Sequence, residues 1–294
     1  MAANDFHSDR LVVIGVGLIG GSVAAALRRA GRVGRVVGVG RGRANIALAL
    51  ERGVIDEASD DIAAAVAGAD TVLLAVPVRQ TDAVLEAIAP ALGPRALVTD
   101  AGSTKQDFVA SVRRLLPEHL EYVVPGHPIA GAEQTGVEAA TADLFEGRKV
   151  VLTPVPESAA ASVDRVEAMW QACGARVLRM APEHHDRVFS AVSHLPHMLA
   201  YSLVHMIATR PDAQELFGFA ASGFRDFTRI AGSSPEMWRD IALANREALL
   251  ADLDAYGARL AQLSASLRAS DGEALAHLFE NARDARNAWL RRGG

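Results

Sequence analysis

The sequence predicts an α/β fold, with a mostly parallel, doubly wound sheet in the N-terminal part and an all-helical C-terminal part. Short β-rich runs alternate with Ala- and Leu-rich runs over about the first 180 residues, which is the pattern of βαβ units. After about residue 182 the β-rich runs stop, and helical patterning continues almost to the end. We therefore expect one domain over residues 1–181 and a second, helical domain over residues 182–294.

Seven β-rich runs are the expected strands, and several are apolar at consecutive positions, as in strands buried on both faces. They span residues 11–16, 35–40, 71–76, 96–101, 122–126, 149–155 and 176–180. In the helical half, leucines between residues 249 and 267 recur near a spacing of 3.6. Breaks are expected at residues 208–213 and 232–235. At the second break, Ser233 or Ser234 precedes Pro235, which is typical of a helix start.

Composition narrows the class of protein. The net charge of −5 argues against a nucleic-acid partner, because phosphate binding requires a basic face. The single cysteine, Cys173, excludes internal disulfide bonds. No apolar run is long enough to span a bilayer, and the N-terminus MAANDFHSDR lacks the apolar core of a signal peptide. We expect a cytoplasmic protein with no membrane partner.

The stretch GVGLIGG (15–21) follows the first expected strand and opens the first expected helix. Gly15, Gly17 and Gly20 form the G-x-G-x-x-G pattern, which permits a tight turn, close approach of a pyrophosphate, and close helix–strand packing. We therefore predict a Rossmann-type dinucleotide-binding domain; a glycine-rich turn without a ligand is the alternative. The expected nucleotide contacts also include four neighbours, Leu18, Ile19, Val76 and Pro77.

The end of the second expected strand bears on which dinucleotide binds. Enzymes that use NAD usually place Asp or Glu there to hold the ribose 2′-hydroxyl. This chain has Gly40, followed by Arg41 and Arg43, and two guanidinium groups could pair with a 2′-phosphate. We favour NADP, and keep NAD as the alternative, with both arginines then solvated.

Polar residues gather where later strands are expected to end. Ser103 lies in DAGSTK (100–105), where it faces the nicotinamide crevice or caps the next helix. His127 lies in GHPIAGAEQTG (126–136), at the end of an apolar run and among glycines and a proline. A histidine in such a loop is more typical of an active site than of a core. His127 is therefore the expected catalytic residue, with Ser103 beside it.

Five segments in this order resemble the prephenate and arogenate dehydrogenases, also called cyclohexadienyl dehydrogenases. The segments are the G-x-G-x-x-G start, DAGSTK, GHPIAG-x-E-x-x-G, EHHD with SHLPH (193–197), and GFRDFTRIA with P-x-MW. The resemblance implies a Rossmann domain followed by a helical dimerisation domain, and hence a homodimer. It also implies oxidative decarboxylation of prephenate or arogenate, with hydride transfer to NAD(P), in tyrosine biosynthesis.

The resemblance also implies how the substrate is held. His127 would hydrogen-bond the ring hydroxyl, and Ser103 would hold the same hydroxyl or orient His127. The substrate carboxylates require cations, and Arg229 is our choice for the ring carboxylate. The other expected contacts are Arg225, Glu133, Ser193, His194 and His197.

Several residues in these segments also have interpretations that involve no contact with the substrate. Arg225 could equally be a solvated charge, and Glu133 and Asp226 could position the arginines. His184 and His185 are expected to begin the helical half and to face solvent or the other domain. We expect no metal, because dehydrogenase chemistry of this kind requires none.

Two other functions remain as alternatives. A 3-hydroxyacid type of dehydrogenase has the same architecture but typically uses a lysine base on the interdomain helix, and the stretch from His184 to Met206 contains no lysine. A dinucleotide-binding sensor without catalysis would keep the glycine loop and lose the polar site. Oxidation of prephenate by the purified protein would separate the three.

Overall fold

The computed structural model describes residues 6–131 and 134–292. Contacts divide the chain into two compact units, Met1–Arg246 and Glu247–Gly294. The first unit holds both sheets and the helices α1 to α11, and the second consists of long helices. The domain boundary predicted between residues 181 and 182 falls between β9 and α7, and it stays a prediction.

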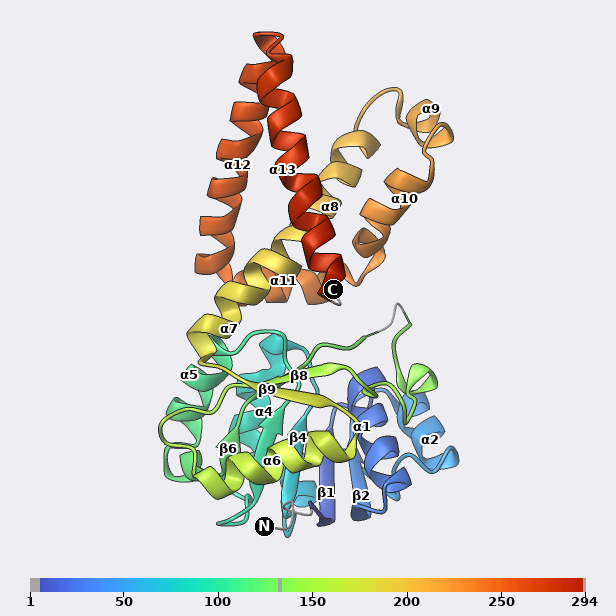
Figure 1. Ribbon diagram of the computed structural model, residues 1–294. Helices are drawn as coiled ribbons and strands as arrows, with labels where there is room; N and C mark the ends of the chain where they lie inside the picture. The colour runs from blue at the N-terminus through green and yellow to red at the C-terminus, as the bar shows by residue number, and fades with distance from the viewer. Residues whose placement is uncertain (1–5, 132–133, 293–294) are drawn as a thin grey trace. The chain divides into compact units, whose positions relative to one another are not determined.

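A six-stranded parallel sheet in the order β3-β2-β1-β4-β5-β6 forms the centre of the first unit (Figure 1). The predicted α/β class is therefore confirmed. The chain runs from β1 outward through β2 to β3 and then crosses to the other side of β1 at β4, and a ligand crevice forms at such a switch point. The strands are β1 (Ser8–Ile14), β2 (Val33–Val39), β3 (Glu57–Ser59), β4 (Thr71–Leu74), β5 (Leu97–Asp100) and β6 (Val123–Val124).

Each face of this sheet has its own apolar core, because alternate side chains of a strand point to opposite faces. Leu11 and Val13 of β1 pack in a cluster with residues of α1, α2 and α6, whereas Val12 and Ile14 pack with residues of α3, α4 and α5. The helices are α1 (Leu18–Arg29), α2 (Arg43–Glu51), α3 (Ile62–Val66), α4 (Thr81–Ile88), α5 (Gln106–Leu115) and α6 (Ala160–Ala172).

A second sheet carries His127. It contains β7 (Gly126–Pro128), β8 (Lys149–Leu152) and β9 (Arg176–Arg179), with β7 antiparallel to β8 and β8 parallel to β9. The runs predicted at 149–155 and 176–180 are strands, but they belong to this small sheet and do not extend the parallel one. The run predicted at 122–126 is split at Pro125, which has no backbone N–H to donate to a ladder.

Helices follow β9, as the sequence predicts. A π-helical turn at Ser190–His194 joins α7 to α8, and a 3₁₀ turn at Arg229–Gly232 follows α10. Ser234 caps the last helix of this unit by accepting a hydrogen bond from the Met237 N–H. The helices are α7 (Pro182–Phe189), α8 (Leu195–Ala208), α9 (Ala213–Gly218), α10 (Ser222–Thr228) and α11 (Pro235–Ala244).

The second unit contains α13 (Gly272–Arg291) and all but the first residue of α12 (Arg246–Arg268). Ser270, with φ of 52°, makes the turn between them, and Asp271 caps α13 by accepting from the Ala274 N–H. Large apolar side chains of both helices are exposed: Leu250, Leu260, Leu267, Leu278, Phe279, Trp289 and Leu290. Within the described part of the chain, we find no helix with the length and apolar character needed to cross a bilayer.

Candidate active site

The glycine loop is shaped by close backbone packing. Gly15 has φ of +100°, and a Cβ there would lie 2.3 Å from the Ala75 carbonyl oxygen, just after β4. A Cβ on Gly20 would lie 2.2 Å from the Gly15 carbonyl oxygen. Gly17 is different, because nothing lies within 4 Å of the position that its Cβ would occupy. Two glycines are therefore required by the fold, and the third leaves open space beside the backbone.

This open space lies at the beginning of α1. Gly17 is the N-cap residue and offers no side-chain hydrogen bond, and the first turn of α1 carries no acidic residue. The N–H groups at the start of a helix attract anions, so the loop fits the pyrophosphate of a dinucleotide. Leu18, Ile19 and Val76 are half-buried here, and Pro77 is exposed at the start of the next turn. The loop therefore suits the cofactor that the sequence predicts.

Arg41 and Arg43 follow the end of β2, and both are exposed. Residues 40–44 contain no carboxylate. Asn45 is already engaged, because it donates to the Val16 carbonyl and accepts from the Val137 N–H. The strand end therefore offers cations to a bound nucleotide and no group that would repel a phosphate.

The His127 ring is held by a second histidine. Its Nδ1 lies 2.8 Å from Nε2 of His185, which is fully buried in α7. Phe189, one turn later, packs against both imidazoles, with ring centroids 4.9 Å from His127 and 4.5 Å from His185. His127 itself is half-buried. The candidate catalytic ring is thus fixed by one hydrogen bond and one aromatic contact.

The hydrogen bonds continue to a buried carboxylate. His185 Nδ1 lies 2.8 Å from an oxygen of Asp186, which is 1% exposed. The same carboxylate accepts the backbone N–H groups of Lys105 and Gln106, each at 2.9 Å. Asp186 therefore joins α7 to the start of α5, directly after the DAGSTK loop.

Lys105 fixes the backbone beside His127. Its ammonium is fully buried, pairs with Asp100 at the end of β5, and donates to the Gly126 carbonyl at 2.7 Å. Asp100 also accepts the Gly126 N–H at 3.0 Å and the Gly102 N–H at 2.8 Å. Both backbone groups of Gly126 are thus bound by one buried ion pair, which places His127 relative to β5.

Burial keeps this histidine cluster uncharged. It lowers the pKa of His127 well below the ordinary value, and the neighbouring His185, Lys105 and His194 act in the same direction. Burial also lowers the pKa of His185, although its bond to Asp186 opposes the change. For Asp186, burial alone would raise the pKa, but the hydrogen bonds from His185, Gln106 and Lys105 outweigh it and lower the pKa. At neutral pH the histidines are neutral and Asp186 is ionised.

His194 and His197 lie against Trp238. His194 is buried and accepts at Nδ1 from the Asn245 side chain at 3.0 Å, and burial lowers its pKa to about 4. His197 stacks on the Trp238 ring with centroids 3.5 Å apart, and its Nδ1 donates to the Ser193 carbonyl at 2.8 Å. Burial lowers the pKa of His197, and the charge of Arg229 lowers it further. Arg229 is thus electrostatically coupled to His197.

The remaining predicted residues have fewer ties to the cluster. Ser193 is half-buried, and its carbonyl rather than its hydroxyl makes the contact with His197. Ser103 is half-buried in the loop after β5, and no hydrogen bond to His127 is among its described contacts. Arg225 is exposed on α10, without an ion pair to any residue of 6–131 or 134–292. Glu133 lies outside the described residues.

The sequence did not identify the supports of His127. We expected His184 and His185 to face solvent or the other domain; His184 is exposed, and the buried His185 contacts His127, which lies in the other predicted domain, but its part in the site was not predicted. Asp186, Lys105 and Asn245 were not predicted as part of the site. One signal was available in the sequence. Lys105 and Asp186 stand close to apolar residues, and a lysine or an aspartate that becomes fully buried nearly always has a partner.

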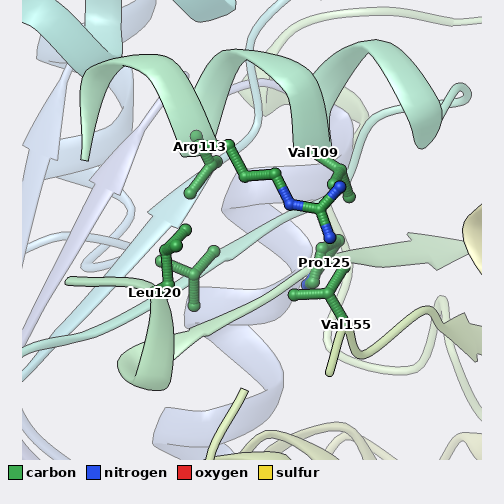
Figure 2. Close-up of a pocket in the computed structure, with 7 residues that line it drawn as sticks. Val109, Arg113, Leu120, Pro125 and Val155 are labelled. Carbon is green, nitrogen blue, oxygen red and sulfur yellow. The ribbon is translucent and has the colours of Figure 1, made fainter. Parts of the chain in front are cut away.

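A small pocket elsewhere is not a substrate site. Figure 2 shows Val109 and Arg113 of α5 beside Leu120, Pro125 and Val155. Its volume of about 10 Å³ leaves room for one water molecule at most. The Arg113 guanidinium is already paired with Glu157, at 2.9 and 3.1 Å.

Comparison with known proteins covers nearly the whole chain. A family profile described as prephenate dehydrogenase, nucleotide-binding domain, matches residues 23–179. A second, described as prephenate dehydrogenase, dimerization domain, matches residues 181–281. These two matches together span most of the sequence.

Individual relatives agree with the profiles. Prephenate dehydrogenase of Bacillus subtilis is 38% identical over 281 residues, covering 95% of this chain and 76% of that protein. Cyclohexadienyl dehydrogenase of Zymomonas mobilis is 38% identical over 282 residues, covering 95% of each. A crystal structure of prephenate dehydrogenase from Aquifex aeolicus, in complex with hydroxyphenyl propionate and NAD+, is 37% identical, with a TM-score of 0.85. That match covers 92% of this chain and 95% of the Aquifex chain.

Proposed function

This chain belongs to the prephenate dehydrogenase family, and we propose that it oxidises prephenate, or the related arogenate, at the site around His127. It is an NAD(P)-dependent oxidoreductase with cyclohexadienyl dehydrogenase activity in tyrosine biosynthesis. The observation that carries the proposal is the buried hydrogen-bonded chain that ends at His127, at the carboxyl edge of a Rossmann sheet.

The reaction removes hydride from the ring carbon that bears the hydroxyl. Carbon dioxide leaves as the ring becomes aromatic, giving 4-hydroxyphenylpyruvate from prephenate or tyrosine from arogenate. When bound, the nicotinamide supplies the hydride acceptor. Because aromatisation makes the step strongly favourable, the protein has mainly to orient the substrate and to polarise its hydroxyl.

His127 is the group that we assign to the hydroxyl. A neutral imidazole can accept the hydroxyl hydrogen bond and take the proton as the carbonyl forms. Burial, together with the nearby His185, Lys105 and His194, lowers the pKa of His127 and keeps the ring neutral in the physiological range. Ser103, from the neighbouring loop, would donate to the same hydroxyl oxygen.

The substrate carboxylates require donors. Arg229 would grip the ring carboxylate through two parallel hydrogen bonds. His197, which donates from Nδ1 to the Ser193 carbonyl, would donate from Nε2 to the side-chain carboxylate when protonated, and the bound anion would raise the pKa that burial and Arg229 lower in the free site. His194 and Ser193 lie beside it, and Arg225 would add a second guanidinium.

For the cofactor, we propose NADP over NAD. The support is the pair of exposed arginines after β2 and the absence of a carboxylate from residues 40–44. The solved relative from Aquifex holds NAD+, so the two cofactors must be compared directly on this chain.

We also propose that the chain forms a homodimer through residues 182–294. The profile that matches residues 181–281 is that of a dimerization domain. The exposed apolar side chains of α12 and α13 would be covered by a second copy. A cytoplasmic location stays a prediction, which fractionation of cells that express the chain would test.

The test is a rate measurement with four combinations of substrate and cofactor. Purified protein is mixed with prephenate or arogenate and with NAD or NADP, and the absorbance of the reduced nicotinamide is followed. We expect turnover with at least one substrate, and a higher kcat/KM for NADP than for NAD. Absence of turnover in all four mixtures, by a protein that binds dinucleotide, would contradict the proposed activity.

A further inference from the structure

A three-residue hydrogen-bonded chain runs from Asp186 through His185 to His127, and it settles where the protons of both imidazoles lie. We propose that His185 and Asp186 are positioning residues that hold His127 with a proton on Nδ1 and an unprotonated Nε2 facing the substrate. The role in catalysis rests on the function proposed above, whereas the proton positions rest on the contacts alone.

The Asp186 carboxylate determines which nitrogen of His185 carries the proton. It accepts the backbone N–H groups of Lys105 and Gln106 at 2.9 Å, and its third contact is His185 Nδ1 at 2.8 Å. The two backbone groups can only donate, and together with the hydrogen bond from His185 they hold the pKa of this carboxyl below its ordinary value despite burial. An ionised carboxylate can only accept. His185 must therefore carry its proton on Nδ1.

His185 in turn determines which nitrogen of His127 carries the proton. Burial lowers the pKa of this imidazole, so it is neutral and has one N–H. With that proton on Nδ1, its Nε2 is an acceptor. The facing atom is Nδ1 of His127, at 2.8 Å, which must then be the donor. Because His127 is neutral as well, its Nε2 has no proton.

Other proton positions on His127 and His185 fit the same contacts less well. With both tautomers reversed, His185 would carry its proton on Nε2 and donate to Nδ1 of His127. The unprotonated Nδ1 of His185 would then face the buried Asp186 carboxylate, so that two lone pairs would oppose each other. Rotation of either ring is opposed by Phe189, whose ring lies against both. Lys105 cannot replace His185 as the donor, since its ammonium is engaged by Asp100 and the Gly126 carbonyl. One proton arrangement satisfies every group in the chain.

The arrangement prepares His127 for its proposed task. An unprotonated Nε2 can accept the proton of the substrate hydroxyl as the C–H bond breaks and the carbonyl forms. The imidazolium that results keeps its Nδ1–H bond to His185, whose Nδ1–H is held by the anionic Asp186. The bond to His185 thus strengthens as charge develops, so its loss should lower kcat more than it raises KM.

The first experiment reads the tautomers without any reaction. Protein labelled with ¹⁵N in its histidines is studied by two-bond ¹H–¹⁵N correlation at neutral pH, without substrate or cofactor, with His127→Asn and His185→Gln used to assign the signals. We expect His127 and His185 both to carry the proton on Nδ1. A proton on Nε2 of His127 would overturn the proposal.

The second experiment separates positioning from packing. His185→Leu removes the acceptor that faces His127 Nδ1, and we expect kcat to fall about 10- to 100-fold with little change in KM for substrate or cofactor. His185→Gln can place its side-chain oxygen near the position of Nε2, and should recover most of the lost kcat. The exposed neighbour provides the matched control, His184→Leu, which should leave kcat unchanged.

The outcomes are distinguishable. Equal losses in the Leu and Gln variants would indicate that His185 only fills space, and would overturn the positioning role. If His185→Leu does not fold, as judged by circular dichroism, the Gln variant and the wild-type tautomers still decide. If the wild-type protein oxidises neither substrate, the proposed function fails, while the tautomer measurement stands as a separate result.

Discussion

His127 combines three properties that an acceptor for an alcohol proton requires. Its ring is half-buried and so remains reachable, its orientation is fixed by His185 and Phe189, and its surroundings keep it neutral. A buried imidazole accepts a proton less readily than one in water, since desolvation and nearby positive charge oppose it. In the arrangement proposed above, the Asp186 carboxylate would act through His185 to offset part of that penalty.

Replacement of His127, proposed to contact the ring hydroxyl, and replacement of Arg229, proposed to hold the ring carboxylate, should change different kinetic constants. We expect His127→Asn to lower kcat about 10² to 10⁴-fold, the usual range for loss of an acid–base group, with little change in KM. Arg229→Ala should chiefly raise KM for prephenate, because its contact exists before and during hydride transfer. Steady-state kinetics at saturating cofactor would check both.

Near-normal turnover by a folded His127→Asn enzyme would remove this histidine from the mechanism. Dinucleotide binding, measured by fluorescence titration, serves as the control and should survive both substitutions.

Arg41 and Arg43 should determine cofactor choice. Replacing both with Ala should raise KM for NADP far more than for NAD, since each lost hydrogen bond to a charged group costs about 1.5 to 3 kcal/mol. The comparison is made on the same enzyme with both cofactors. A wild type that uses NADP no better than NAD would already refute the assignment.

The buried histidines should make the fold sensitive to acid. The pKa of His194 is about 4 in the folded protein against about 6.5 in a free chain, so the unfolded state binds more protons between these values. The contribution to stability is complete above about pH 6.5 and is lost as the pH falls toward 4. It amounts to about 3 kcal/mol for this residue alone.

Urea unfolding at a series of pH values would measure this loss. His194→Gln should flatten the pH dependence, whereas His184→Gln, at an exposed position, should leave it unchanged. If the free energy of unfolding fell equally steeply with falling pH in the wild type and in His194→Gln, the result would contradict the explanation.

At the scale of elements, two glycines of the loop between β1 and α1 have different roles. Gly20 permits close packing of the backbone, and Gly17 would leave space for the dinucleotide. Gly20→Ala places a Cβ against the Gly15 carbonyl and should destabilise the protein by about 1 to 3 kcal/mol, the usual cost of overpacking. Gly17→Ala meets nothing within 4 Å and should leave stability unchanged. It should nevertheless weaken dinucleotide binding about tenfold, because the added methyl group would occupy the open space and move the pyrophosphate away from one of its charge-assisted hydrogen bonds.

Thermal unfolding and nucleotide titration of both variants would separate the two effects. A Gly17→Ala protein that binds dinucleotide normally would show that the open space beside α1 does not hold the pyrophosphate.

Elements were predictable from sequence to the extent that their signals are local. Parallel strands such as β1 and β4 are continuous apolar runs, and the start of α11 is marked by Ser234 and Pro235. β8 and β9 carry the same signal, but β8 pairs with β7 and with β9 in a separate small sheet, and pairing depends on contacts between distant residues. The bond between His127 and His185 spans 58 positions of the chain, so no local pattern could reveal it.

At the scale of the whole molecule, the exposed apolar side chains of the last two helices predict assembly. Phe279 and Trp289 are 57% and 59% exposed, which is costly for large aromatic side chains in water. We expect a dimer, with about twice the mass of one chain by light scattering at micromolar concentration. Phe279→Asp with Trp289→Asp should shift the mass toward one chain, whereas a monomeric wild type would contradict the prediction.

The π-helical turn at Ser190–His194 has a consequence for how this chain tolerates change in length. A π turn holds one residue more than an α turn, and each residue of a helix advances about 100° around its axis. Deleting one residue between Phe189 and His194 would restore regular α geometry and let α7 and α8 run on as one helix. Because the π turn accommodates its extra residue locally, the side chains after the deletion would keep nearly the same direction, and His197 would still meet Trp238. Homologous sequences should therefore align through this segment either without a gap or with a gap of one residue, whereas gaps inside the flanking α-helices should be rare.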